Sequence, residues 1–314
     1  MLGYSLKRLL LSLPTLFLVA VAVFLIIRLI PGDPAMALLG ENADAASVAA
    51  LHKEMGLDTP LPVQFVTWLS HAVRGDFGHS IVTGEAVLPL ILTRFQLTAT
   101  VVLIAVGLAT LIAVTAGLIA AWRRDTPIDM AVIGVSTIVL SVPSFWLGLV
   151  LLLIFGVALR WLPVVGYVGF SENAGLAALY ILLPTLTLAI TESGVITRMM
   201  RASAIDVLKL DYVTHARAKG LSEAVVLSRH VFPNAFAPTL TLVGLSLGHL
   251  LGGIAVIETV FTLPGLGRLM VDSILSRDYP VVQGCLLFTA TIYVVVNLIV
   301  DLLYPLFDPR VTAS

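Results

Sequence analysis

The stretch TATVVLIAVGLATLIAVTAGLIAA, residues 98–121, contains 24 residues and not one Asp, Glu, Lys, Arg or His. A helix rises about 1.5 Å per residue, so this run is long enough to cross a hydrocarbon core of about 30 Å. Its apolar residues lie all round a helix rather than along one face, as burial in lipid or in a helix bundle requires. The stretch therefore predicts a membrane-spanning helix.

Five further apolar runs are also long enough to cross a membrane. Together the six predicted spans are 9–30, 98–121, 131–155, 176–197, 236–259 and 283–305. Pro143 and Pro184 lie inside two of them, and membrane helices tolerate proline. The chain is 59% hydrophobic and 12% charged, whereas an ordinary soluble domain is about 25% charged. The predicted fold class is an all-α integral membrane protein with six transmembrane helices.

Composition and the N-terminus exclude other classes of protein. The first span follows Lys7 and Arg8 and continues from Leu9 to Ile30, beyond the 7–15 or so residues of a signal-peptide apolar region, so we expect a retained helix. A net charge of −1 gives no electrostatic basis for nucleic-acid binding. A single cysteine, Cys285, allows neither a disulfide framework nor a CxxC metal cluster.

Basic residues divide unevenly between the two sides of the predicted membrane. With the N-terminus in the cytoplasm, the inner segments carry 11 Lys and Arg and the outer segments carry 6, with Arg28 at the outer membrane edge. An excess of Lys and Arg marks the cytoplasmic side, so we expect both termini there. The predicted parts are an N-terminal helix (1–30), a periplasmic segment with short amphipathic helices (31–97), a five-helix core (98–305) that includes a hairpin at 198–235, and a cytoplasmic tail (306–314).

Two segments leave alternatives open. The outer segment begins PGDPA at 31–35 and contains LPVQFVTWL at 61–69, which predicts a short amphipathic helix on the membrane surface. It forms either a cap over an external mouth or a structural plug between helix ends. The run GHLLGG, 248–253, supplies small residues either for close helix packing or for a kink.

The sequence DYVTHARAKGLSEAVVLSRHVFPNA, 211–235, lies between two predicted spans but resembles a soluble helical hairpin. We expect 198–210 to continue the fourth span as helix and a short helix to follow it. Gly220 fits the left-handed position that ends a helix, with Leu221 as the apolar residue after it. Ser222 is a candidate cap for a second helix, Glu223 suits its first turn, and Pro233 is expected to end it. The alternatives are a solvated loop or a compact knob that seats in a partner.

This hairpin resembles the EAA loop of ABC-importer permeases. The general form is Glu-Ala-Ala-x-x-x-Gly, then nine residues, then Ile-x-Leu-Pro. Here Thr214-His215-Ala216 precedes Gly220 by three residues, and nine more residues lead to His230-Val231-Phe232-Pro233. The Gly and Pro spacing is kept, but the family Glu, first Ala, Ile and Leu are replaced. The variant resembles that of the dipeptide/oligopeptide/nickel branch.

Other stretches along nearly the whole chain resemble hallmarks of the same branch. They are FLIIRLIPGDPA (24–35), MGLDTPLPVQF (55–65), GDFGHSI (75–81), SVPSFWLGLVLLLIF (141–155), WLPVVGY (161–167), IETVFTLPGLGRLMVDSILSRDYPVVQG (257–284) and NLIVDLLYPLFDPR (297–310). The resemblance implies a type I ABC importer permease of the bacterial inner membrane.

The resemblance also implies partners and a coupling site. Such a permease forms half of a translocation pathway with a homologous second permease, two cytoplasmic ATPase subunits and a periplasmic or lipid-anchored solute-binding protein. The chain contains no GxxxxGK[ST] phosphate loop, so we expect no cofactor on it, and ATP and Mg²⁺ on the ATPase subunits. The hairpin 211–235 would dock in an ATPase cleft. The residues expected to couple are Asp211, Thr214, His215, Ala216, Ala218, Gly220, Leu221 and Glu223.

Charged residues within spans are costly and suggest function. Glu192, near the inner end of the fourth span, and Arg198, just beyond that span, either form an ion pair or a polar contact at the inner mouth or line the pathway. His249 either lines the pathway or forms a hydrogen bond within the bundle. Glu258 and Asp301 lie near span ends, where interfacial anchoring explains them.

The expected cargo is short peptides, with nickel or another small solute as the alternative. His71 and His79 do not make a metal site on spacing alone, and no metal site is expected. Among other classes, an ion-coupled secondary transporter would show inverted repeats and paired broken helices, and we find no repeat. An intramembrane metalloenzyme would show a motif such as HExxH, and this motif does not occur.

Overall fold

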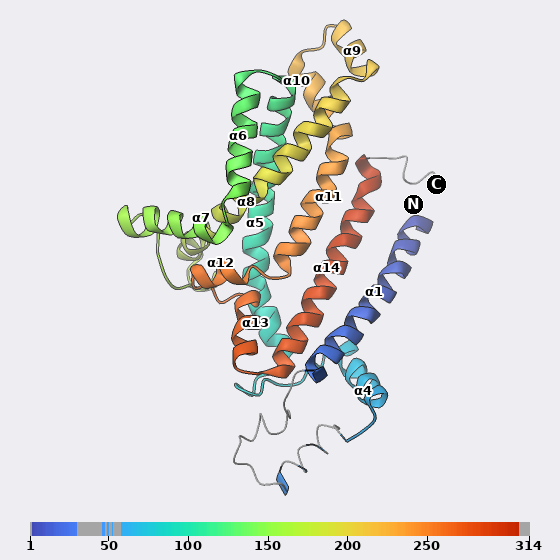
Figure 1. Cartoon of the computed structure of the whole chain (residues 1–314), viewed down its shortest axis with the longest axis vertical. Coiled ribbons are helices and arrows are strands. Elements are labelled where there is room, and N and C mark those ends of the chain that lie inside the picture. Colours follow the sequence, from blue (N-terminus) through green and yellow to red (C-terminus); the bar gives the residue numbers. More distant parts are fainter. Residues whose placement is uncertain (1, 30–45, 48, 50–51, 53–57, 308–314) are drawn as a thin grey trace.

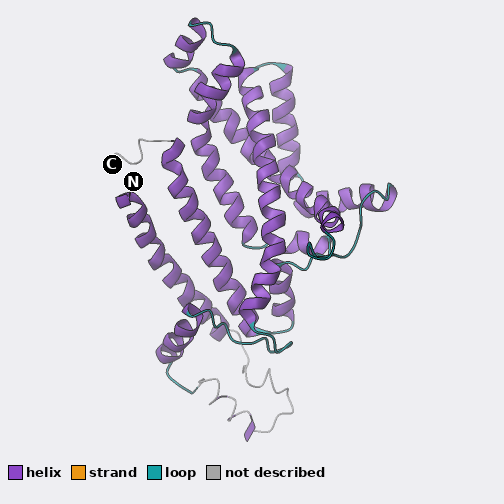
Figure 2. Cartoon of the chain, turned by 180° about the vertical axis from the view of Figure 1, so that it is seen from behind, coloured by secondary structure: helices purple, strands orange, loops and turns teal. Residues whose placement is uncertain are grey.

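The structure is a computed structural model that describes residues 2–29, 46–47, 49, 52 and 58–307. Within these residues the chain is helical, with one isolated bridge between His79 and Ala86 and no strand (Figure 2). The first half contains α1 (Leu2–Leu29), α4 (Leu61–Val73), α5 (Val87–Trp122), α6 (Pro127–Ser141), α7 (Ser144–Leu151) and the π-helix η1 (Leu152–Ala158). The second half contains α8 (Ala174–Leu208), α9 (Asp211–Ala218), α10 (Glu223–Val225), the π-helix η2 (Val226–Val231), α11 (Phe232–Leu251), α12 (Ala255–Val260), α13 (Leu266–Leu275) and α14 (Tyr279–Phe307).

Five helical stretches are long and apolar enough to cross a membrane. They are Arg8–Ile26, Val87–Trp122, Ala174–Leu208, Glu223–Leu251 and Tyr279–Pro305, and the bent pair α6 and α7–η1 is the sixth if it counts as one span. The all-α membrane fold is thereby confirmed. The described N-terminal end of α1 and the C-terminal end of α14 lie toward the same end of the bundle as α9, while α4 lies at the opposite end (Figure 1).

The centre of the bundle is the pair α5 and α8. Gly117 of α5 lies so close to α8 that a Cβ atom there would be 2.8 Å from the Cβ of Met200. Gly244 of α11 likewise leaves room for Val300 of α14, because a Cβ atom on Gly244 would lie 2.3 Å from the Val300 side chain. Small residues thus set the helix spacing, as packing in membranes requires. In contrast, α1 lies at the edge of the bundle beside α14 (Figure 1).

The third predicted span is not one straight helix. Two helices of 127–141 and 144–158 meet there at 98°, and α7 leaves the bundle sideways (Figure 1). The cause is Pro143, which forces an extended conformation on Val142 (φ −97°, ψ 124°) and supplies no N–H for a continuing helix. Pro184, by contrast, lies within the continuous α8.

The fifth predicted span, 236–259, is wrong at both ends. The helix starts upstream at Glu223 and ends at Leu251, so Glu258 belongs to the separate helix α12. Both interpretations of GHLLGG apply to different glycines. Gly248 packs against Tyr293, since a Cβ there would be 2.9 Å from the ring, whereas Gly253 has φ +140° and breaks the helix.

The outer segment is only partly described, and PGDPA with the rest of 30–45 lies outside the described residues. Its amphipathic string belongs to α4, which packs on the C-terminal half of α1 through Phe65, Trp68 and Phe24. The last part of the predicted segment, from Val87 on, is already helical, because α5 begins there. The short tail 308–314 also lies outside the described residues.

A buried carboxylate joins two loops at the end of the bundle opposite the hairpin. Asp278, 3% exposed, accepts hydrogen bonds from Ser80 Oγ (2.5 Å) and from the backbone N–H of Ile81 (3.1 Å). It therefore holds the turn before α5 against the turn before α14. In the same loop, a hydrogen bond from His71 (2.9 Å) holds the pKa of Asp76 below its usual value.

Candidate coupling site

The hairpin 211–235 consists of α9, a turn at Gly220, and a helix that begins at Glu223. Gly220 has φ +81°, and the backbone N–H of Leu221 donates to the carbonyl of Ala216 (3.4 Å), closing the end of α9. This is the turn that the sequence predicts. Ser222, however, makes no side-chain hydrogen bond to the second helix. Instead Arg217 forms a two-pronged ion pair with Glu223 across the turn, at 2.8 and 3.1 Å.

The second helix of the hairpin does not stop at Pro233, contrary to the prediction. Residues Val226–Val231 widen into a π-helix that runs directly into α11. The wider turn makes room for the Pro233 ring, which would otherwise clash with the carbonyl groups of the preceding helical turn. The carbonyl of His230 receives Asn234 Nδ2 at 2.9 Å and the Tyr212 hydroxyl at 3.3 Å. Burial raises the pKa of Tyr212, which keeps this hydroxyl a donor.

A small apolar core joins the hairpin to the end of the bundle. Its buried residues are Ala121, Met200, Ala204, Val207, Val213, Ala216, Val226, Val231 and Ala235. They come from α5, α8, both arms of the hairpin and α11. The hairpin is therefore a rigid continuation of the bundle and not a tethered loop. Ala216, expected on the coupling surface, is 5% exposed and packs inside this core.

The other expected coupling residues of α9 share one exposed face. Asp211, Thr214, His215 and Ala218 follow the i, i+3, i+4, i+7 pattern of a single helix side, and all four are exposed. Gly220 and Leu221 continue this surface at the tip, where Leu221 is 39% exposed. We call the surface of Asp211, Thr214, His215, Ala218 and Leu221 the hairpin face. It projects beyond the ends of α1 and α14 (Figure 1).

A buried ion pair that the sequence analysis missed lies just below the hairpin. Asp129 of α6, 2% exposed, accepts both Nε and Nη2 of Arg201 from α8, at 2.5 and 2.6 Å. The same carboxylate accepts the backbone N–H of Asp125, which has φ +62°. Arg201 is one residue from Met200 in the hairpin core. The pair therefore clamps the α5–α6 turn to the helix that carries the hairpin.

The expected polar residues of the spans do not form one site. Arg198 and His249 are exposed and Glu192 is half-buried, and no ion pair joins Glu192 to Arg198 in the described part of the chain. Six residues along a helix place the two side chains about 120° apart around its axis, which explains the missing pair. The expected ion pair is therefore not formed, while a polar contact of either residue at an inner mouth stays a prediction.

Glu258 was expected to anchor the protein at a membrane interface, and this expectation is wrong, because the residue is only 1% exposed. Its carboxylate accepts Thr98 Oγ1 of α5 (2.6 Å) and the backbone N–H of Arg268 (2.8 Å), while Thr98 Oγ1 also accepts the N–H of Leu266 (2.9 Å). The first turn of α13 is thus capped by side chains of α12 and α5. A Cβ on Gly265 would be 2.0 Å from the carboxylate, so the close fit requires glycine.

The sequence matches two families along its length. Residues 113–313 match the family described as binding-protein-dependent transport system inner membrane component, and residues 1–107 match the N-terminal region of that membrane component. These matches, with the membrane-length helices, define a multi-pass permease of the ABC-importer class.

Individual relatives cover nearly the whole chain. A probable peptide ABC transporter permease of Sinorhizobium fredii is 41% identical over 308 residues, 98% of each chain. A putative peptide transport system permease of Brucella suis is 40% identical over 306 residues, 98% of each. The glutathione transport system permease GsiC of Escherichia coli is 42% identical over 312 residues, 99% of each. The chain belongs to the family of binding-protein-dependent transport system inner membrane components.

One solved structure, of an amino acid ABC transporter with histidines, aligns with a TM-score of 0.47 and 20% identity, covering 71% of this chain and 94% of that one.

Proposed function

We propose that this permease imports short peptides. The observation that carries the proposal is the similarity, along 98–99% of the chain, to relatives that are named as peptide or glutathione permeases. Glutathione is itself a tripeptide. Nickel or another small solute is the alternative cargo. The ring of His71 is engaged by Asp76 at 2.9 Å, which does not favour a metal pathway through that histidine.

The hairpin face is proposed to seat in a cleft of a cytoplasmic ATPase. It is exposed, it lies at the tip of a rigid extension of the bundle, and its helix is held by the Arg217–Glu223 ion pair and a buried core. A rigid extension transmits force, whereas a mobile loop would absorb it. Movement of the ATPase would then rock α8 and α11 as one body with the hairpin.

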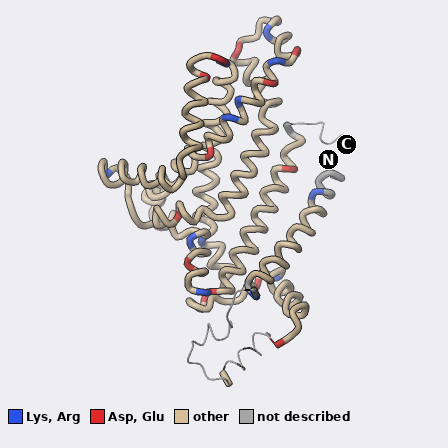
Figure 3. The backbone as a smooth tube through the Cα atoms, viewed as in Figure 1, with Lys and Arg blue, Asp and Glu red and all other residues tan. Residues whose placement is uncertain are grey.

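The remaining assembly follows from the family. The chain would pair with a homologous second permease, two ATPase subunits that hold ATP and Mg²⁺, and a periplasmic or lipid-anchored solute-binding protein. It would therefore hydrolyse nothing itself and bind no cofactor. Basic residues lie on and near the hairpin (Figure 3). The segments predicted for the hairpin side hold 11 Lys and Arg and those predicted for the opposite side hold 6, a difference that favours a cytoplasmic hairpin and cytoplasmic termini in a bacterial inner membrane.

Uptake by reconstituted vesicles tests the cargo and the energy source together. The chain is reconstituted with its genomic partner subunits, and entry of radiolabelled di- and tripeptides is compared with entry of ⁶³Ni²⁺. We expect peptide uptake that requires ATP and the binding protein, and that persists when an ionophore abolishes ion gradients. Uptake of nickel without uptake of peptides would show that nickel is the cargo. Uptake that requires an ion gradient but no ATP would identify a secondary transporter instead.

A further inference from the structure

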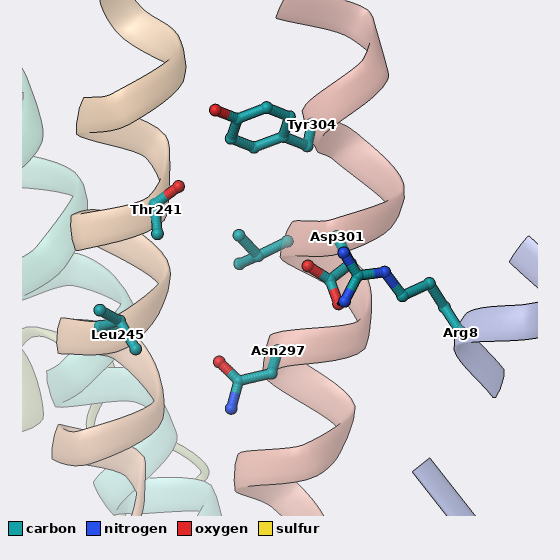
Figure 4. A pocket seen from close by; sticks show the side chains of 7 residues that line it. Arg8, Thr241, Leu245, Asn297, Asp301 and Tyr304 are labelled. Atoms are coloured by element: carbon teal, nitrogen blue, oxygen red, sulfur yellow. The ribbon is translucent and has the colours of Figure 1, made fainter. Parts of the chain in front are cut away.

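Two cavities lie on either side of an ion pair between α1 and α14. Arg8 and Asp301 are 3.0 Å apart. The first cavity, about 190 Å³, is lined by Arg8, Thr241, Leu245, Asn297, Val300, Asp301 and Tyr304 (Figure 4). The second, about 230 Å³, shares Arg8, Asn297 and Asp301 and extends along α1 and α14 through Leu11, Ser12, Thr15, Tyr293, Val294 and Leu298. The two spaces together form a polar-centred groove with apolar walls.

The first cavity contains three polar side chains, those of Thr241, Asn297 and Tyr304. Asn297 and Tyr304 point from α14 toward α11, where Thr241 points back at them (Figure 4). Within the described residues, no hydrogen bond joins any of these three side chains to another group. These amide and hydroxyl groups are available to a ligand that carries donors and acceptors of its own.

The depth of the groove matches a lipid headgroup. The helices α1 and α14 contain 28 and 29 residues, about 43 Å each, so each exceeds a 30 Å hydrocarbon core by roughly 6 Å at either end. Arg8 and Asp301 each lie six residues from a helix end, or about 9 Å. The ion pair is therefore close to the boundary between hydrocarbon and headgroups, at the hairpin end. The α1 span is only 17% buried in the protein, so lipid has lateral access.

We propose that this groove binds the headgroup of an aminophospholipid from the adjoining leaflet. The guanidinium of Arg8 donates to the phosphate, and the carboxylate of Asp301 accepts from the primary ammonium. Asn297, Thr241 and Tyr304 supply further hydrogen bonds to the phosphate and glycerol oxygens. The apolar residues Leu11, Val294 and Leu298 lie where an acyl chain would run. A headgroup without an amine would leave a carboxylate facing a phosphate, and a trimethylated amine has no N–H to donate.

Lipid retention by the full-length chain tests the proposal. The protein is placed in nanodiscs of equal parts phosphatidylethanolamine, phosphatidylcholine and phosphatidylglycerol, extracted in mild detergent, and its bound lipids are counted by mass spectrometry. We expect phosphatidylethanolamine to be enriched about tenfold, which is the effect of one charge-assisted contact. Equal retention of the three lipids, or preferential retention of phosphatidylglycerol, would overturn the proposal.

Two variants locate the site. Asp301→Asn removes the negative charge that pairs with the ammonium, so phosphatidylethanolamine and phosphatidylcholine should be retained nearly equally. Asn297→Leu leaves the ion pair intact and should reduce retention of every phospholipid, which keeps the test valid even if Asp301→Asn fails to fold. Thr115→Val is the control, because Thr115 is exposed on α5 and bonds only to its own helix. An unchanged lipid preference in both groove variants would contradict this site.

Discussion

At the scale of single residues, the Asp129–Arg201 pair is the most consequential contact near the hairpin. A carboxylate that is 2% exposed is stable only while its partner and hydrogen bonds remain in place. The pair joins α6 to α8, and α8 carries the hairpin. Its loss should therefore weaken both the fold and the transmission of force.

Asp129→Asn should destabilise the protein by about 3 kcal/mol, because it leaves the Arg201 guanidinium partly buried without an anion. Arg201→Lys keeps the charge but loses the two-pronged geometry, so its effect should be smaller. Thermal unfolding in detergent and peptide uptake measure the two consequences. A melting temperature unchanged by Asp129→Asn would show that the pair contributes nothing to stability.

Gly220 allows a prediction in which volume plays no part. A Cβ at this position meets no atom within 4 Å, so only its φ of +81° selects against other residues. Gly220→Val should abolish most uptake while membrane abundance stays normal, because a branched side chain is strained at positive φ. Gly220→Asn is the matched control, since Asn tolerates the left-handed region, and should keep most uptake. Normal uptake by the Val variant would refute the importance of the turn.

Glu258 acts through the helix that it caps. Glu258→Ala removes the acceptor of the Arg268 N–H and of the Thr98 hydroxyl, at about 1–3 kcal/mol for each buried group left without a partner. Glu258→Gln retains an acceptor oxygen and should be milder. In membrane vesicles whose α4 side faces the medium, protease cleavage within 262–278 should increase from wild type to Glu258→Gln to Glu258→Ala. Equal cleavage of all three proteins would mean that the carboxylate does not hold α13.

At the scale of elements, α9 has two faces with different tasks. Ala216 lies inside the hairpin core and Ala218 on the hairpin face, although they are two residues apart. Ala216→Trp should dislodge the hairpin and lower the melting temperature. Ala218→Trp should leave the melting temperature unchanged and abolish the stimulation of ATPase activity by the binding protein. Loss of stimulation without loss of stability by both variants, or by neither, would argue against the assigned faces.

Elements with local signals were predictable from the sequence, and elements fixed by distant partners were not. The helices α5, α8 and α14 and the turn at Gly220 are determined by residues close together in the sequence. The π-helical passage before Pro233 depends on side-chain donors from Tyr212 and Asn234 that repair the backbone. A proline can end a helix, as at position 143, or lie within one, as at position 184. Tertiary packing decides between these outcomes.

The hairpin and its turn were predictable from the sequence, but the contacts that support the hairpin were not. Its exposed face follows from helical spacing. The burial of Ala216 depends on Met200 and Val226, which the sequence does not place nearby. Asp129 meets Arg201 across 72 residues and Thr98 meets Glu258 across 160. Pairs this remote leave no periodic signal in one sequence.

At the scale of the whole molecule, the orientation can be measured by labelling single cysteines. Cys285 is buried, so it should not react with a membrane-impermeant maleimide. Ser228→Cys on the hairpin should react only in inverted membrane vesicles, whereas Val82→Cys in the exposed outer loop should react in intact spheroplasts. Labelling of Ser228→Cys from outside would reverse the topology and remove the basis for the ATPase contact.

The bend at Pro143 has a mechanical consequence. Half-length α6 and α13 lie above and below the crossing segments α7 and α12 (Figure 1), and Phe261 fits against Gly148 where those segments meet. The stack of α6, α7, α12 and α13 is therefore interrupted at its middle, whereas α5 and α8 are continuous helices of 36 and 35 residues. An interrupted stack bends more easily than a continuous helix, so bending of this subunit should concentrate at the contact between Phe261 and Gly148.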